Sequence, residues 1–219
     1  MSVGALRRPD PMALVIADIT ISLDGFVTGP NAGPANGLGD GGKALHTWAF
    51  SDDPVDAAQL ASGTARSGAV VLGRHLFDVV DGPGGWNEEV GYGAREVGKP
   101  AFVVVTSTPP ATTRLPFWEF VTTGLRDAVA RARDLADAAS AAVGEPRHAV
   151  LMGGGATIGS ALAAGLVDRL HLHISPLVLG GGTPLFAGVD GAPVGPVALV
   201  QRDSVASSTA THVTYDVVR

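Results

Sequence analysis

Residues 22–31 have the sequence SLDGFVTGPN, and this stretch decides how the fold of the chain is predicted. An apolar run from Ala13 to Ile21 precedes it and indicates a buried first strand. Asp24 and Gly25 predict the turn that ends this strand, because both residue types favour turns. A strand that breaks into an acidic residue and glycines is typical of a loop held against a ligand.

A second glycine cluster follows another apolar run, Ala149–Leu151, much later in the chain. It comprises Gly153, Gly154, Gly155, Ala156 and Thr157. At a strand-to-helix junction, backbone N–H groups and the helix dipole favour a phosphate, although such a turn can also be packed for geometry alone. Ile158 stands where a dinucleotide-binding fingerprint has its third glycine, so a standard Rossmann domain is not expected. Two predicted strands that each end in a glycine-containing turn, within one domain, predict a single cleft.

Composition places the chain among compact globular proteins. Of its 219 residues, 46% are hydrophobic and 16% are charged, which indicates one well-buried core. We predict a disordered extension over residues 1–11 and a single domain over residues 12–219. The formal net charge of −6 and the lack of a Lys/Arg run argue against nucleic acid binding.

The chain contains no cysteine, which excludes disulfide bonds, thiolate metal ligands and a cysteine nucleophile. No segment has the character of a signal sequence or a membrane helix, so we predict a cytoplasmic protein without membrane association. His171 and His173 alternate on one predicted strand near Asp168, but a metal site needs a further ligand that the spacing does not supply. No metal site is predicted.

Hydrophobic periodicity predicts an α/β domain with a mainly parallel sheet and an antiparallel hairpin at the carboxyl end. The predicted strands are residues 13–21, 69–72, 101–105, 120–123, 148–152, 168–176, 197–205 and 211–218. The predicted helices are residues 43–50, 54–65, 75–80, 125–143 and 156–165. The hairpin can complete the core or form an edge-to-edge dimer interface.

Polar residues follow two further predicted strands. Gly73 and Arg74 could place a guanidinium beside a phosphate, although a surface salt bridge is the commoner role of an arginine. Thr106 and Ser107 are hydroxyl donors at a strand end or plain turn formers. Asp24 is either a turn former or a proton-handling group that faces the cleft. The residues alone leave each of these alternatives open.

The segment Gly37–Ala44 is similar to a phosphate loop, but Ala44 replaces the hydroxyl residue that would ligate magnesium. We interpret the segment as part of a long lid over the cleft. Trp48 and Trp86 are predicted as core or lid aromatics, because no basic groove accompanies them.

Five short motifs occur in an order that resembles a known superfamily. They are Ser22-Leu23-Asp24-Gly25, Val71-Leu72-Gly73-Arg74, Val104-Val105-Thr106-Ser107, Met152-Gly153-Gly154-Gly155 and Gly165-Leu166-Val167-Asp168. Together they resemble the dihydrofolate-reductase-like superfamily, most closely the branch that contains the reductase domain of riboflavin biosynthesis. The later Ile174–Phe186 segment is similar to the same branch, and the resemblance extends from about Leu14 to Val218.

The resemblance implies a three-layer α/β/α dihydrofolate-reductase-like fold and a stand-alone bacterial reductase that uses NADPH. Gly153, Gly154, Gly155, Ala156 and Thr157 would then take the cofactor pyrophosphate. Gly73, Arg74, Thr106 and Ser107 would surround the adenosine-side phosphate. Ser22, Gly25 and Thr28 would border the nicotinamide and substrate, and Trp48 and Trp86 would contribute to substrate specificity. The resemblance also favours a homodimer.

The activity that the resemblance implies is hydride transfer to a C=N or C=O bond of a pteridine-like or pyrimidine-like heterocycle. Asp24 is the candidate proton donor, and it would need a raised pKa for that role. Two alternatives remain: a deazaflavin-dependent reductase of the same fold, or a non-catalytic module that binds a heterocycle and confers resistance to it.

Overall fold

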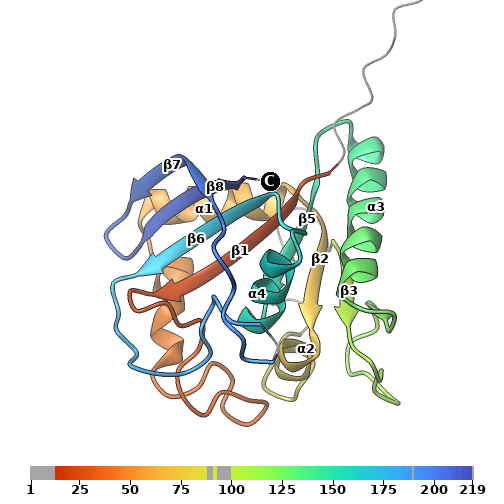
Figure 1. The fold of residues 1–219 in the computed structure, drawn as a ribbon, viewed down its shortest axis with the longest axis horizontal. Helices are drawn as coiled ribbons and strands as arrows, with labels where there is room; N and C mark the ends of the chain where they lie inside the picture. Colours follow the sequence, from red (N-terminus) through yellow and green to blue (C-terminus); the bar gives the residue numbers. More distant parts are fainter. Residues whose placement is uncertain (1–12, 88–90, 93–99, 189, 219) are drawn as a thin grey trace, which may run out of the picture.

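The computed structural model describes residues 13–87, 91–92, 100–188 and 190–218, so the predicted extension over residues 1–11 lies outside the described residues. One eight-stranded sheet runs through the molecule in the order β4-β3-β2-β5-β1-β6-β8-β7 (Figure 1). Its strands are β1 (Val15–Ser22), β2 (Ser67–Gly73), β3 (Ala101–Val105), β4 (Trp118–Val121), β5 (His148–Gly153), β6 (Arg169–Ser175), β7 (Leu199–Ala206) and β8 (Thr211–Val217).

The first six strands in this order are parallel, and β8 and β7 join antiparallel, as the sequence predicts. This mixed sheet confirms the predicted fold class. The fourth strand is displaced, because residues 118–121 and not residues 120–123 pair with β3. The edge strand β7 is exposed along most of its length, while β8 adds Val213 to the buried core.

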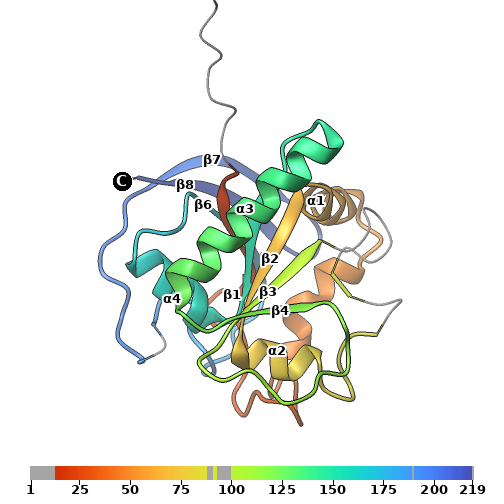
Figure 2. The ribbon, with the colours of Figure 1, turned by 90° about the vertical axis from the view of Figure 1, so that its right-hand side faces the viewer.

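Helices cover both faces of the sheet. They are η1, a 3₁₀ helix (Gly42–Phe50), and the α-helices α1 (Pro54–Ala65), α2 (Arg74–Val80), α3 (Leu125–Val143) and α4 (Gly155–Ala163). The aliphatic core joins α3 and α4 to one face, and aromatic side chains pack near α2 on the other. In Figure 1, α4 lies in front of the sheet and α1 lies behind it. Figure 2 shows the same layers from the side.

Local sequence signals set the helix ends. The Asp53 side chain accepts a hydrogen bond of 2.9 Å from the backbone N–H of Val55, and Pro54 begins α1. Gly144 ends α3 with a φ of 75°, which glycine adopts without the steric cost that other residues bear. The apolar stripe of α3 buries Ala128, Ala132 and other small residues, so this helix lies close to the sheet.

Strand β1 leaves its neighbour β5 early. The two strands pair only from Val15 to Ala17, whereas β1 continues to pair with β6 as far as Ser22. Ala17, Ile19 and Ile21 pack into the core that α3 and α4 cover. Because strand side chains alternate, Asp18 and Thr20 face η1 and α1. Beyond the point where β1 and β5 part, β1 continues with Asp18, which lines one of the two cavities described below, and β5 leads to Gly154, which lines the other.

Candidate functional site

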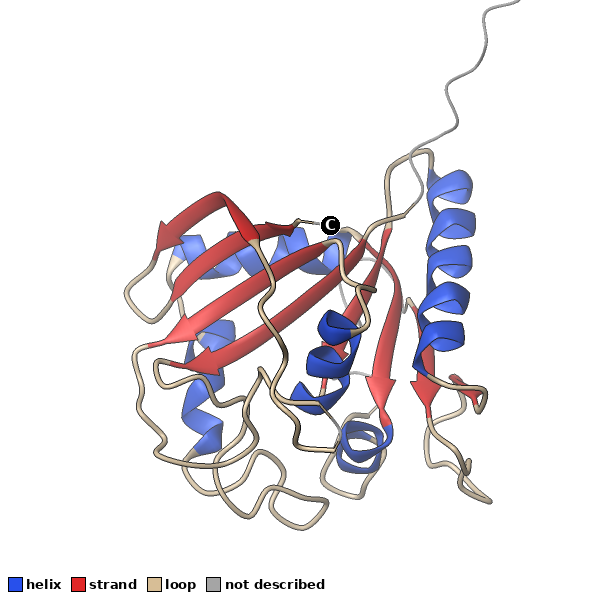
Figure 3. Cartoon of the chain, in the orientation of Figure 1, coloured by secondary structure: helices blue, strands red, loops and turns tan. Residues whose placement is uncertain are grey.

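A cavity of about 750 Å³ opens at the carboxyl ends of the parallel strands. In Figure 3 the long loops gather at this end of the sheet. The carboxyl ends of neighbouring parallel strands meet along one edge, which is where open α/β sheets bind ligands. The residues that line the cavity are Val27, Thr28, Ala32, Gly73, Arg74, His75, Val105, Thr106, Ser107, Thr122, Gly124, Leu125, Gly154, Gly155, Ala156, Thr157, Ser160 and Thr183.

The amino end of α4 supplies the anion-binding part of this cleft. Gly154 caps the helix, and its carbonyl accepts hydrogen bonds from the N–H groups of Thr157 and Ile158. The N–H groups at the start of a helix have no partner within the helix and carry the positive end of its dipole. Gly153, just before the cap, has a φ of 133°, a conformation that side chains rarely allow. This turn can therefore hold a phosphate.

Two glycines allow the walls of the cleft to approach each other. A Cβ atom on Gly73 would lie 2.1 Å from Thr157 Oγ1, and one on Gly155 would lie 2.7 Å from Val27 Cγ2. Neither position has room for a methyl group. The end of β2, the start of α4 and the loop after β1 are therefore packed directly on one another at the floor of the cleft.

Hydrogen bonds hold the guanidinium of Arg74 in place beside the cleft. Its Nε donates to Asp78 Oδ1 at 2.7 Å, and its Nη1 donates to the carbonyl of Thr108 at 2.6 Å. Thr106, beside it, is buried, and its Oγ1 accepts from the N–H of Thr108 at 3.3 Å. The side chain of Arg74 stays 40% exposed, so a fixed cation stands at the edge of the cavity.

The structure does not bring Asp24 into the cleft. Its carboxylate accepts hydrogen bonds from the N–H groups of Leu179 and Gly180, at 3.1 and 2.7 Å. Hydrogen bonds from Ser22 and from these two N–H groups lower the pKa of Asp24 to about 2. Because a proton donor needs a raised pKa, this geometry favours a role in anchoring the loop after β6.

Other predicted substrate residues are distributed between the cleft and the core. Thr28 lines the cleft, and its Oγ1 accepts from the N–H of Thr183 at 3.1 Å. Ser22 is fully buried and accepts from the N–H of Phe26, while Gly25 forms the turn with a φ of 86°. Neither Ser22 nor Gly25 is among the lining residues of the cavity.

The two predicted tryptophans also lie elsewhere. Trp48 is buried, donates from Nε1 to Thr20 Oγ1 at 2.9 Å and stacks on His173 with ring centroids 4.1 Å apart. Trp86 packs edge-on against Phe102, with ring centroids 5.5 Å apart, on the α2 side of the sheet. Trp48 is thus a core aromatic and Trp86 packs, partly buried, against the core, which was one of the roles that the sequence left open.

Several lining residues have no sequence signal that points to the cleft. His75 follows Arg74 and could have been inferred from that neighbour alone. Ala32, Thr122, Gly124, Ser160 and Thr183 come from irregular loops or a helix interior, and only the fold brings them together.

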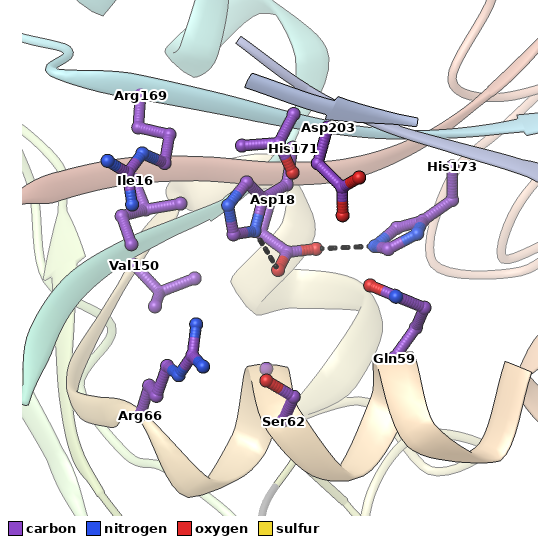
Figure 4. Close-up of a pocket in the computed structure, with 12 residues that line it drawn as sticks. Ile16, Asp18, Gln59, Ser62, Arg66, Val150, Arg169, His171, His173 and Asp203 are labelled. Carbon is purple, nitrogen blue, oxygen red and sulfur yellow. Dashed lines mark hydrogen bonds and ion pairs between the residues drawn. The ribbon is translucent and has the colours of Figure 1, made fainter. Parts of the chain in front are cut away.

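A second, more polar cavity of about 350 Å³ lies between α1 and the sheet (Figure 4). Figure 4 shows Gln59 and Ser62 on α1, and Arg66 just after it, opposite the side chains of the strands. Asp18 stands at its centre, with Oδ1 3.0 Å from His173 Nε2 and Oδ2 3.6 Å from His171 Nδ1. Burial alone would raise the pKa of Asp18, but the interaction with His173, including its hydrogen bond, and the nearby imidazole of His171 outweigh it and hold the pKa well below its ordinary value.

The sequence did not predict this cavity. The alternation of His171 and His173 was visible, but their partners are distant in the chain. Among the residues that the structure describes, no group of three or more histidine, cysteine or acidic side chains could hold a metal ion. Within the same described ranges, no helix is long and apolar enough to cross a membrane.

Comparison with known proteins gives a family and a fold. The family described as RibD C-terminal domain matches residues 13–212. A putative riboflavin biosynthesis protein from Shewanella sp. PV-4 is 22% identical, with a TM-score of 0.58, and the match covers 95% of this chain and 100% of that one. A dihydrofolate reductase from Enterococcus faecalis, solved with NADP(H), is 14% identical, with a TM-score of 0.55, covering 94% and 97%.

A third solved structure is longer than this chain. It is the diaminohydroxyphosphoribosylaminopyrimidine deaminase/5-amino-6-(5-phosphoribosylamino)uracil reductase of Thermotoga maritima, 12% identical with a TM-score of 0.55. The match covers 94% of this chain and 57% of that protein. The search of curated proteins gives no match. The family match confirms the resemblance noted in the sequence, and the solved structures confirm the fold.

Proposed function

The chain belongs to the RibD C-terminal domain family, and we propose that it is an NADPH-dependent reductase of a pyrimidine-like or pteridine-like heterocycle. The observation that carries this proposal is the pairing, in one cleft, of the amino end of α4 with the fixed guanidinium of Arg74. The pyrophosphate of a dinucleotide would bind at the amino end of α4, and the 2′-phosphate of NADPH would bind to Arg74. The residues of the cleft fit this cofactor.

The roles of the residues follow from their places. Gly154, Gly155 and Ala156 would bind the pyrophosphate through backbone N–H groups, and Gly73 leaves room for the close approach of the two walls. Arg74, with Thr106 and Ser107, would bind the adenosine-side phosphate. When bound, the reduced nicotinamide supplies a hydride. The chain itself orients the two rings and keeps them close.

The cofactor assignment predicts selective loss of affinity in the Arg74→Ala variant. We expect the Kd for NADPH to rise about 10-fold to 100-fold, because hydrogen bonds to charged groups contribute about 1.5–3 kcal/mol. The Kd for NADH should change little, since NADH has no 2′-phosphate. Fluorescence titration of both nucleotides measures this difference.

Two controls separate recognition from damage to the cleft. Asp78→Asn weakens the anchor of Arg74 but leaves the guanidinium, so it should retain most of the preference for NADPH. Arg202→Ala removes an arginine from the exposed strand β7 and should bind like the wild type. Failure of the wild type to bind either nucleotide would overturn the NADPH proposal and leave the deazaflavin enzyme or the binding module.

A further inference from the structure

Four side chains form one continuous hydrogen-bonded chain across three strands of the sheet and α1; three of them are buried and Asp18 is partly exposed. Asp18 Oδ1 lies 3.0 Å from His173 Nε2, and His173 Nδ1 lies 2.7 Å from His212 Nδ1. His212 Nε2 lies 2.8 Å from Asp56 Oδ1. His212 and Asp56 are only 3% and 1% exposed. We call this set the imidazole chain.

The number of protons in the imidazole chain follows from its geometry. Each of the three contacts needs one hydrogen, and an ionised carboxylate can only accept. Both Nε2 atoms must therefore carry a hydrogen, and the contact between the two Nδ1 atoms needs one more. Three hydrogens on four ring nitrogens make one ring neutral and the other cationic. The pair thus holds one proton more than two neutral imidazoles.

The surroundings agree with one extra proton and oppose a second. Burial alone would raise the pKa of Asp56, but hydrogen bonds from Ser207, Ser51 and Thr209 and from His212 outweigh it, so this carboxyl stays ionised. Burial lowers the pKa of His212 in spite of Asp56, which disfavours a doubly charged pair. The ionised Asp56 and the buried His212 therefore favour a pair that holds one extra proton and not two.

The imidazole chain has one closed end and one open end. At the closed end, the hydroxyls of Ser51 and Thr209 both donate to Asp56 Oδ2 at 2.5 Å. At the open end, Asp18 and His173 line the cavity between α1 and the sheet (Figure 4). Asp18 is also the first residue of β1 beyond the part that pairs with β5. The imidazole chain therefore meets the cavity at Asp18 and His173.

The charged and titratable groups around the open end come from every element that faces it. They are His46 of η1, Arg66 just after α1, Arg169 and His171 of β6, Asp203 of β7, and Tyr92, whose pKa burial raises far above its ordinary value. His46 Nδ1 is buried and has no hydrogen-bond partner among the described residues.

We propose that the imidazole chain supplies the proton of the reduction, and that Asp18 passes it to a heterocyclic substrate bound in the α1-side cavity. This inference rests on the proposed reductase function. In the reduction of a C=N bond, the carbon would take a hydride with its electron pair from reduced nicotinamide. The nitrogen would take the proton of His173 Nε2, which the ionised carboxylate of Asp18 receives and passes on. Asp18 ends ionised, as it began, and the imidazole pair becomes neutral until water in the cavity reprotonates it. His173 and His212 are positioning residues in this scheme.

The first test needs no substrate. In protein labelled with ¹⁵N at histidine, NMR of the wild type at pH 7 should show three protonated nitrogens in the His173–His212 pair and a coupling across the two Nδ1 atoms. Raising the pH should remove one proton from the pair. His148→Gln, a matched change outside both cavities, should leave these signals unchanged. Two neutral rings throughout the range from pH 5 to 9 would overturn the proposal.

The second test measures turnover. With NADPH and 5-amino-6-(5-phosphoribosylamino)uracil or dihydrofolate as probes, Asp18→Asn should lower kcat about 10²-fold to 10⁴-fold without changing the KM for NADPH. The kcat of the wild type is expected to fall at high pH, Asp18→Asn should lose this fall, and His148→Gln should retain it. A fully active Asp18→Asn enzyme would overturn the proposal.

The two proposals fail in different ways. If the wild type does not bind NADPH in the fluorescence titration, the proposed function fails whatever the histidine spectra show. If NADPH binds but neither probe shifts the ¹⁵N signals of His171 and His173 in the complex with NADP⁺, the substrate site assigned to the α1-side cavity fails while the cofactor assignment stands.

Discussion

Replacing Gly73 with alanine is expected to destabilise the protein and weaken NADPH binding at least tenfold. The new methyl group would lie 2.1 Å from Thr157 Oγ1, so the Thr157 side chain, or the start of α4 that carries it, would have to move away from β2. Overpacking of this kind costs about 1–3 kcal/mol in the free energy of unfolding. The same movement would spread the N–H groups that we assign to the pyrophosphate. Urea denaturation and NADPH titration measure the two effects.

The double variant Gly73→Ala/Thr157→Ala provides the matched control. Removing Thr157 Oγ1 takes away the nearest atom and leaves the Cβ of residue 157 at 3.4 Å, a distance that needs only a small adjustment. Most of the lost free energy of unfolding should therefore return, while Thr157→Ala alone should have a small effect on stability. If Gly73→Ala and the double variant were equally destabilised, the contact between the new methyl group and Thr157 Oγ1 would not be the cause of the lost stability.

Asp56→Ala is expected to lower the free energy of unfolding by about 3–5 kcal/mol at pH 7. The substitution leaves His212 Nε2 and the hydroxyls of Ser51 and Thr209 without their common acceptor in a buried place. Removing one partner of a buried charged pair is costly, because the other partner stays desolvated. Asp134→Ala, on the exposed face of α3, should have little effect.

The same site makes stability depend on pH in a defined direction. The pKa of Asp56 is lowered on folding, so its contribution is complete above about pH 4, the unfolded value, and disappears as the pH falls further. The pKa of His212 is also lowered, so the folded protein opposes a second proton on the imidazole pair, and stability is lost as the pH falls below about 6.5. The free energy of unfolding should therefore fall from about pH 6.5 to pH 4 and below.

Urea denaturation between pH 3 and pH 8 tests this dependence. In Asp56→Asn the amide cannot ionise, so the fall below about pH 4 should be shallower than in the wild type. Asp134→Asn should retain the slope of the wild type. A wild-type stability that does not change across this range would contradict the assigned hydrogen bonds of Asp56.

The position of the main cleft could be predicted because it depends on local signals. Glycines that directly follow apolar strands mark carboxyl ends, and parallel strands bring those ends to one edge. Gly73, Thr106 and Gly154 come together there, as the sequence indicated. The boundaries of α1 and α3 were also predictable, since Asp53, Pro54 and Gly144 act on their own neighbours.

The roles of Asp24 and Trp48 could not be predicted, because they depend on distant partners. An acidic residue on a glycine turn suits a loop anchor and a proton donor equally. Only the loop that carries Leu179 and Gly180 shows which groups the Asp24 carboxylate meets. Likewise, Trp48 follows an irregular loop, and its burial against His173 follows from how η1 packs on the sheet.

The sequence by itself determined the alternation of strands and helices and the glycine turns that follow the strands. These turns mark the edge of the sheet at which the proposed cofactor cleft forms. Both depend only on periodicity and on residues a few positions apart. Only the tertiary structure decided the imidazole chain. Strand register places His173 opposite His212, and the neighbouring β1 brings in Asp18 from 155 positions away. No local pattern encodes a contact that the pairing of three strands and the packing of α1 create.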